Sequence, residues 1–282
     1  MAGQLTYGYG SDRYESNLQL EHYDTGFQMD TAFFNRTGYS GGNFYFGRNF
    51  YPDKKRYPWF KTFTPFVFAT GGRDRPQGGN EALGLLAVRF DFTRQGFLRL
   101  DTAAGQIPWR GRVFPLRFWR IRGNGQLFRW LNLDASAEFD RRAIYYDDVD
   151  PFSGRERSFS FGGTFQPNGR LNQQISYNRD TFDRLAGAGR VYSVDIVNSK
   201  TTYQFNRRFS VRAIGRFDSS RKRVLTDFLA AWEPRPGTVA YAGYGALFEQ
   251  RGWDGSDWLS GQGNYINNRR GFFSKLSYLY RL

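Results

Sequence analysis

The residues that could perform catalysis are few in this chain. There is one histidine, His22, and no cysteine among the 282 residues. Hydrolases with a serine nucleophile place a histidine as general base beside the serine and orient it with an aspartate. His22 alternates with Leu18 and Leu20, so we expect it to face lipid or an interface and to have no catalytic role.

A group of acids, Asp147, Asp148 and Asp150, is the other candidate for chemistry. Two carboxylates can act as acid and base in glycoside hydrolysis. These acids fall in a predicted loop over 144–156 that also holds Pro151, where solvated acids are the more common case. We therefore predict no catalytic residue, no metal site and no cofactor, and the lack of cysteine excludes a thiolate zinc site.

The charge is strongly basic and widely distributed. Lysine and arginine number 40 against 26 acids, which gives a formal charge of +14. Nucleic-acid binders usually gather such charge in a patch or along a helix. Here the arginines alternate with apolar residues over most of the chain, so we predict no nucleic-acid partner. Spacing of this kind places charge on one face of many strands.

The polar face defined by this alternation forms the predicted functional surface. Mixed rings of charge in a pore tune ion selectivity, and a net basic ring favours anions. The same residues could instead form cross-strand ion pairs that hold a sheet rigid. The charged members of the face are Arg89, Asp91, Arg99, Asp101, Arg120, Arg122, Asp134, Glu138, Arg212, Arg216, Lys275 and Arg281.

The elements that must position these residues are strands. From Leu131 to Asp140 every odd residue is apolar and every even one is polar, the period expected of a strand with one wet face. The longest apolar runs, such as Phe228 to Trp232, are far shorter than the roughly 18 residues of a membrane-spanning helix. An aromatic content of 19% argues against disorder.

Alternation and turn residues predict about sixteen strands, within a range of about 14–18. From the sixth predicted strand onward, short links alternate with long ones such as Gly105 to Phe114 and Arg251 to Asn268. Outer-membrane barrels combine short periplasmic turns with longer external loops. We therefore predict one domain over 1–282, an all-β, transmembrane, antiparallel, up-and-down β-barrel in a bacterial outer membrane. The predicted strands lie near 3–10, 14–24, 26–35, 40–49, 59–71, 81–92, 96–105, 115–129, 131–143, 157–166, 170–180, 190–205, 208–219, 222–233, 238–249 and 269–282.

Aromatic residues should mark the membrane boundaries of such a barrel. An alternative is that they fill the core of a soluble sandwich or barrel, but the consistently polar second face of the clearest strands opposes this. The predicted girdle consists of Trp59, Trp119, Trp130, Tyr203, Trp232 and Tyr280.

The last predicted strand has its own signature. Leu276, Tyr278, Tyr280 and Leu282 share one face, and a terminal strand of this kind resembles the signal read by the outer-membrane barrel assembly machinery. The usual final residue is Phe or Trp, so Leu282 departs from the pattern. The lipid bilayer and this machinery are therefore the predicted macromolecular partners.

Several stretches together resemble an uncharacterised outer-membrane family. They are Gly26–Phe27 with Phe34–Tyr39, Tyr203–Arg212, Ala240–Tyr244 and Phe273–Arg281. Members pair an N-terminal carbohydrate-binding, family 9-like domain with a C-terminal barrel. The resemblance implies that this chain corresponds to the barrel and is the C-terminal part of a longer protein. It implies no catalytic residue.

Three functions follow as hypotheses. The first is a passive, porin-like pore for small polar or anionic solutes, since about 16 strands leave an aqueous channel unless it is plugged. The second is a membrane anchor or binding platform for a periplasmic carbohydrate-binding or carbohydrate-processing domain. The third is an envelope carbohydrate hydrolase that acts through a domain outside this sequence. The residues near Met1 lack the apolar core of a signal peptide, and the sequence leaves the solute and oligomeric state open.

Overall fold

The computed structural model describes residues 1–28, 37–147, 149–185, 189–256 and 258–278. The regular secondary structure in these ranges consists of sixteen β-strands. They are β1 (Ala2–Gly10), β2 (Tyr14–Tyr23), β3 (Tyr39–Arg48), β4 (Phe60–Asp74), β5 (Gly79–Phe92), β6 (Phe97–Trp109), β7 (Arg112–Phe128), β8 (Leu131–Tyr145), β9 (Phe152–Phe165), β10 (Leu171–Arg184), β11 (Arg190–Gln204), β12 (Phe209–Asp218), β13 (Arg223–Arg235), β14 (Thr238–Trp253), β15 (Trp258–Ser260) and β16 (Asn264–Tyr278).

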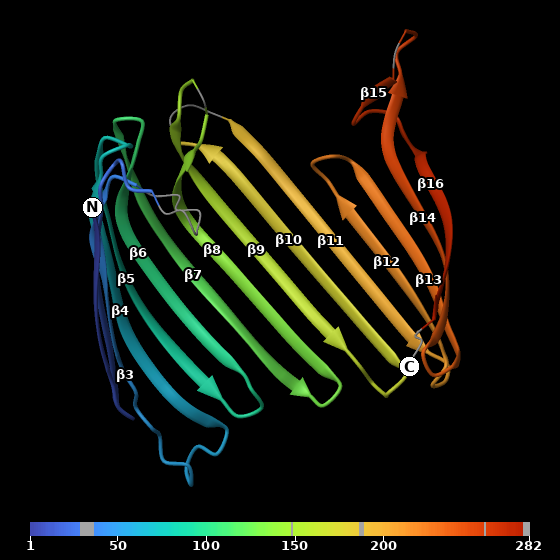
Figure 1. Ribbon diagram of the computed structural model, residues 1–282, viewed down its shortest axis with the longest axis horizontal. Helices are drawn as coiled ribbons and strands as arrows, with labels where there is room; N and C mark the ends of the chain where they lie inside the picture. The colour runs from blue at the N-terminus through green and yellow to red at the C-terminus, as the bar shows by residue number, and fades with distance from the viewer. Residues whose placement is uncertain (29–36, 148, 186–188, 257, 279–282) are drawn as a thin grey trace. The chain divides into compact units, whose positions relative to one another are not determined.

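The strands form a single sheet in which neighbours in sequence are neighbours in space (Figure 1). The order runs from β1 to β14, and β16 then pairs with β14. The short β15 pairs with the end of β14 at Arg251–Trp253. This confirms the predicted all-β class and the antiparallel, up-and-down order. No ladder in the described ranges returns from the last strand to β1, so closure of the sheet stays a prediction.

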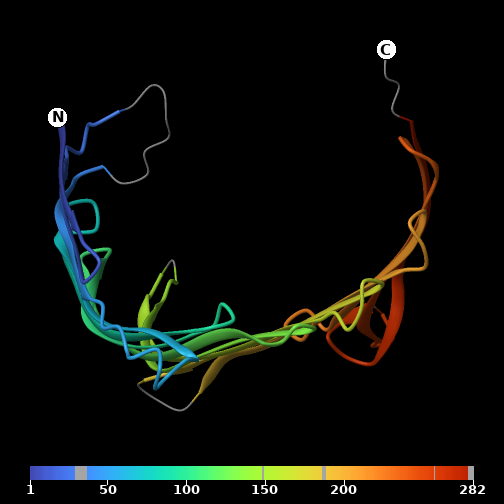
Figure 2. The same cartoon turned by 90° about the horizontal axis from the view of Figure 1, so that it is seen from below.

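The chain divides into two compact units. Unit 1 comprises residues 1–124, 136–158 and 181–191, and unit 2 comprises 125–135, 159–180 and 192–282. Figure 2 shows the blue to green strands of unit 1 as a single layer. A single layer leaves both faces of its strands without a second sheet to pack against.

The predicted strand at 26–35 is wrong where the structure describes it. Gly26 to Gln28 are not in a strand, and the rest of the predicted strand, 29–35, lies outside the described residues. Strand β2 pairs with β1 along one edge and directly with β3 along the other, so both of its edges are occupied. No further strand therefore lies between β2 and β3 in the sheet, as far as the described residues show. The short β15 instead brings the number of strands to sixteen.

The predicted long link from Gly105 to Phe114 is also wrong. Strand β6 continues to Trp109, β7 begins at Arg112, and only Arg110 and Gly111 form the turn. Their φ values are 50° and 74°, which fits a two-residue hairpin turn whose twist matches that of the strands. The link from Arg251 to Asn268 is likewise shortened, because β14 continues to Trp253 and β16 begins at Asn264.

The described part of the sheet has almost no apolar core. Its buried apolar residues are eight, three of them alanines, and none of these residues is less than 2% exposed. Large apolar side chains are instead widely exposed, including Leu86 at 61% and Trp119 at 59%. A soluble sheet protein of this size would bury such side chains. Within these residues, no helix is long and apolar enough to cross a membrane.

Candidate functional site

The two faces of β6 and β7 in unit 1 have opposite chemistry. On one face Leu100 lies opposite Ile121 and Thr102 opposite Trp119, and on the other Asp101 lies opposite Arg120. Leu100 is 40% exposed, whereas Asp101 is 3% exposed. The apolar face is therefore bare and the polar face is covered by its own side chains. This is the arrangement expected when lipid, rather than water, surrounds the apolar face.

Arginines on this polar face form a row across three strands. Arg89 of β5 lies opposite Arg99 of β6, which lies opposite Arg122 of β7. Like charges directly opposite one another destabilise a sheet. The row therefore requires counter-charges, and the structure supplies them from the same face. Arg89 makes an ion pair with Asp91 at 2.8 Å.

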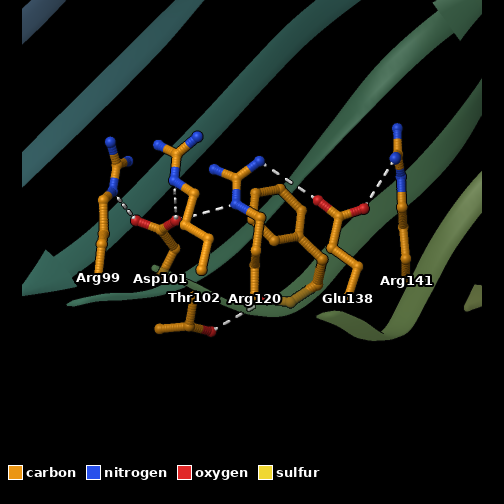
Figure 3. Close-up of polar contacts among 8 residues, drawn as sticks. Arg99, Asp101, Thr102, Arg120, Glu138 and Arg141 are labelled. Atoms are coloured by element: carbon orange, nitrogen blue, oxygen red, sulfur yellow. Dashed lines mark hydrogen bonds and ion pairs between the residues drawn. The ribbon is translucent and has the colours of Figure 1, made fainter. Parts of the chain in front are cut away.

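Asp101 is the central counter-charge of the row. Its side chain is fully buried and contacts three guanidinium groups, those of Arg99, Arg120 at 2.9 Å and Arg122 at 3.8 Å. Figure 3 shows its carboxylate between Arg99 and Arg120. A carboxylate shared among several arginines gains charge-assisted hydrogen bonds that offset the cost of its burial. Asp101 thus fixes the arginine row in place.

The network continues along the face through Glu138 of β8. Glu138 accepts hydrogen bonds from Arg120 at 3.3 Å and from Arg141 at 2.9 Å (Figure 3). Arg141 also lies 3.4 Å from Glu156 of β9. The result is a chain of ion pairs from Arg99 to Glu156, with the separate Arg89–Asp91 pair beside it. We call these residues together the ion-pair cluster: Arg89, Asp91, Arg99, Asp101, Arg120, Arg122, Glu138, Arg141 and Glu156.

The ion-pair cluster retains unused positive charge. Its five arginines face four carboxylates. The Nε atom of Arg122 is buried and has no hydrogen-bond partner, and its contact with Asp101, at 3.8 Å, is too long for a hydrogen bond. Arg122 thus has donor capacity that its protein neighbours do not satisfy. An anion reaching this face would find an incompletely paired guanidinium.

The structure brings together seven of the predicted charged residues and leaves the others apart. Arg89, Asp91, Arg99, Asp101, Arg120, Arg122 and Glu138 all belong to the ion-pair cluster. In unit 2, Arg212 and Arg216 lie opposite Leu229 and Leu225, and Lys275 lies opposite Tyr241. Within the described ranges neither these three nor Asp134 makes an ion pair. Arg281 lies outside the described residues.

The five predicted girdle residues that the structure describes are exposed, and three of them lie at one end of unit 2; Tyr280 lies outside the described residues. Trp130 lies in the β7–β8 turn, Tyr203 near the end of β11 and Trp232 near the end of β13, so all three are at the same end of an up-and-down sheet. Trp130 stacks on Phe128 with ring centroids 4.9 Å apart. The exposed fractions of Trp59, Trp119, Trp130, Tyr203 and Trp232 are 56%, 59%, 41%, 37% and 54%.

The final strand presents the predicted assembly signal on one face. Leu276 lies opposite Ala240 and Tyr278 opposite Thr238 on β14. Their exposed fractions are 72% and 70%. Tyr280 and Leu282 lie outside the described residues. Recognition by the assembly machinery stays a prediction.

The sequence analysis missed a polar constellation on the other face of the sheet. His22 lies directly opposite Ser40 in the β2–β3 ladder, and its ring contacts both Ser40 and Asp24. Asp24 is visible from sequence as an acid two residues after the sole histidine. Ser40 was not identifiable, because its place opposite His22 depends on a register set across a long connection. The face of His22, shared with Leu18 and Leu20, is as expected.

Comparisons with known proteins add little to this description. No protein-family model matches the chain, and no curated protein matches it. Among solved structures it is similar to the "CymD monoaromatic hydrocarbon channel", with a TM-score of 0.27 and 10% sequence identity, covering 98% of this chain and 80% of that chain. A likeness this slight transfers neither fold details nor a solute.

Proposed function

We propose that the sheet closes into a transmembrane barrel of a bacterial outer membrane and forms a passive pore for small polar solutes. The observation that carries the proposal is the inverted pattern of burial, with Trp119 59% exposed and Asp101 3% exposed on opposite faces of paired strands. In a bilayer the apolar face contacts lipid and the polar face borders an aqueous lumen. The bilayer and the barrel assembly machinery are then its partners.

The charge on the polar face sets the expected preference of the pore. The ion-pair cluster has one guanidinium more than it has carboxylates, and Arg212, Arg216 and Lys275 of unit 2 add unpaired cations. A lumen with excess positive charge raises the local concentration of anions. Small anionic solutes should therefore pass more readily than cations of equal size.

Conductance in a planar bilayer tests this proposal. The folded chain should give discrete channels, and a salt gradient should give a reversal potential of the sign that marks anion preference. Replacing Arg89 and Arg122 together by Gln should reduce that preference, because it removes two cations from the polar face. The matched control, Arg129→Gln, changes a cation in the exposed β7–β8 turn and should leave the preference intact. Correctly folded protein without channels would refute the pore.

A second function is favoured by one feature of the cluster. Asp101 and Glu138 are each held by at least two arginines, a lattice that stiffens a sheet. A rigid barrel with a filled interior would serve as a membrane anchor or platform for a periplasmic carbohydrate-binding or carbohydrate-processing domain. The bilayer experiment separates the two, since an anchor folds and inserts but does not conduct.

A further inference from the structure

The exposed face of β2 and β3 carries a serine, a histidine and an aspartate in hydrogen-bonding contact. The Nδ1 atom of His22 lies 2.7 Å from Ser40 Oγ. The Nε2 atom lies 3.1 Å from Asp24 Oδ1. Both ring nitrogens are thus engaged, one by a nucleophile and the other by an acid. A histidine between a serine and an acid can activate the serine. The two ring nitrogens are exchanged relative to the usual triad, in which Nε2 faces the serine and Nδ1 the aspartate.

The acid determines which nitrogen can act as the base. An ionised carboxylate only accepts hydrogen bonds, so Nε2 must carry the proton that it donates to Asp24 in neutral His22. Nδ1 is then unprotonated and accepts the hydrogen bond donated by the Ser40 hydroxyl. The neutral ring is therefore in the tautomer that can remove the serine proton. Asp24 acts through His22 and is a positioning residue.

The backbone holds Asp24 at the end of β2, beside the start of β3. Its carbonyl oxygen accepts hydrogen bonds from the N–H groups of Phe27 at 3.1 Å and Gly38 at 3.2 Å. The His22 and Asp24 side chains are 42% and 48% exposed. The group is therefore anchored yet accessible from outside.

A cation lies next to the serine on the same face. Arg73 of β4 is directly opposite Ser40, and opposed side chains in a ladder have Cβ atoms about 5 Å apart. Arg73 is exposed and forms no ion pair within the described parts of the chain. Its guanidinium is therefore available to stabilise negative charge that develops on an oxygen beside Ser40.

The surface next to these residues is apolar and flat. Leu20 lies opposite Gly42, and Gly42 lies opposite Gly71, in the adjoining row of the same face. Leu20 and the neighbouring Phe44 are 46% and 40% exposed. Gly3, opposite His22 on β1, has open space where a side chain would be. An apolar chain could lie on this face with its head at Ser40.

We infer that Ser40, His22 and Asp24 form a hydrolytic site for carboxylic esters with an apolar acyl chain. Ser40 Oγ attacks the ester carbonyl carbon while His22 Nδ1 takes the serine proton. The tetrahedral intermediate collapses, the C–O bond to the alcohol breaks, and His22 returns the proton to the leaving oxygen. Water, deprotonated by His22, then attacks the carbonyl carbon of the acyl-serine. The bond from that carbon to Ser40 Oγ breaks, His22 gives its proton to Oγ, and the acid is released. The activity is additional to the proposed pore and does not depend on conductance.

Covalent labelling of the folded protein in detergent tests the inference directly. A fluorophosphonate carrying an alkyl chain should modify wild-type protein at Ser40, located by mass spectrometry of its peptides. Hydrolysis of p-nitrophenyl octanoate should exceed that of the acetate. Ser40→Ala and His22→Asn should each lower octanoate turnover at least about 100-fold. Asp24→Asn should slow labelling, and Asp24→Glu should restore part of the rate, which a purely structural role would not produce.

Matched controls keep these outcomes decisive. Ser16 lies on β2 on the same face as His22, opposite Phe46, so Ser16→Ala should leave labelling and turnover unchanged. Heat-modifiable migration on gels checks that each variant is folded. Wild-type protein without an adduct on Ser40, or turnover equal in wild type and Ser40→Ala, would overturn the inference. Labelled protein that forms no channels would refute only the pore.

Discussion

The polar faces of the two units use similar residues to different effect. In unit 1, Asp101 lies directly opposite Arg120, and its carboxylate also contacts Arg99 and Arg122. In unit 2, Asp227 lies opposite Ile214 on one side and Gly245 on the other, and the described residues offer it no ion pair. Further along the same face, Glu249 pairs with Arg223 and Arg251. Composition determines that a face is charged, whereas register determines, at each position, whether a charge is neutralised.

The space around the unpaired Asp227 also differs from that around the paired Asp101. Asp227 occupies space above Gly245, where an added Cβ would lie 2.6 Å from its Oδ1 atom. Together with Leu225, Leu247 and Arg269 these residues line a groove of about 420 Å³. The ion-pair cluster instead fills its face with arginine side chains. We therefore expect the ion-pair cluster to contribute stability and the surroundings of Asp227 to contribute accessible space.

The largest expected change in the free energy of unfolding comes from removing the carboxylate of Asp101. Asp101→Asn leaves Arg99, Arg120 and Arg122 without their common counter-charge, and breaking a buried ion pair from one side destabilises by about 3–5 kcal/mol. The partly exposed arginines place the expected loss near the lower end. Urea unfolding of the protein in lipid vesicles, followed by tryptophan fluorescence, measures the free energy of unfolding.

Asp227→Asn is the matched control for that measurement. Asp227 has no guanidinium partner within the described residues, so the substitution should change the free energy of unfolding of the protein by less than about 0.5 kcal/mol. Equal losses in the two variants would contradict the contrast between a paired carboxylate, Asp101, and an unpaired one, Asp227.

The chain's alternation predicted the faces of both units but not the pairing within them. The period of 2 is a local property, so Arg99, Asp101, Arg120 and Arg122 could be assigned to one face from sequence alone. Which residue opposes Asp101 depends on the length of the β6–β7 turn. The sequence suggested a long link there, and the two-residue turn at Arg110 and Gly111 that sets the register was not recognised.

The Ser40–His22–Asp24 constellation shows the same limit more strongly. His22 was correctly placed on the apolar face, and that placement led to the expectation that it is inert. Its contacts arise because β2 pairs directly with β3, bringing Ser40 opposite across a connection that sequence reasoning filled with a strand. A residue's face follows from local pattern, whereas its partner follows from topology.

A smaller loss of stability is expected from adding a methyl group beneath an aromatic ring in each unit. A Cβ at Gly154 would lie 2.1 Å from Phe182 Cε1 and 2.8 Å from the Asp183 carbonyl oxygen, and one at Gly243 would lie 2.2 Å from Phe273 Cε1. Phe182 is 2% exposed and Phe273 is 53% exposed. Gly154→Ala should therefore cost about 1–3 kcal/mol, since Phe182 has little room to move.

Gly243→Ala provides the comparison in unit 2. The exposed Phe273 ring can rotate away, so the loss should stay below that of Gly154→Ala when both are measured by urea unfolding in vesicles. A larger loss at Gly243 would show that the face of unit 2 is the more tightly packed of the two, the reverse of the contrast drawn above.

The smallest effect concerns an acid in solvent, which sharpens the contrast with the buried Asp101. In the β8–β9 connection, Asp147 Oδ1 accepts hydrogen bonds from the N–H groups of Val149 at 2.8 Å and Asp150 at 3.1 Å. These bonds lower the pKa of Asp147 below its ordinary value. A carboxyl with a lowered folded-state pKa stabilises the fold at pH values above its unfolded pKa of about 3.9, and that stabilisation is lost as the pH falls through the folded value.

Asp147→Asn should therefore speed hydrogen exchange of the Val149 and Asp150 amides near neutral pH. The variant and wild type should converge once the wild-type carboxyl is protonated, while global stability in urea stays unchanged. If Asp147→Asn instead lowered the global stability in urea, the β8–β9 connection, and not only the ion-pair cluster, would support the sheet of unit 1.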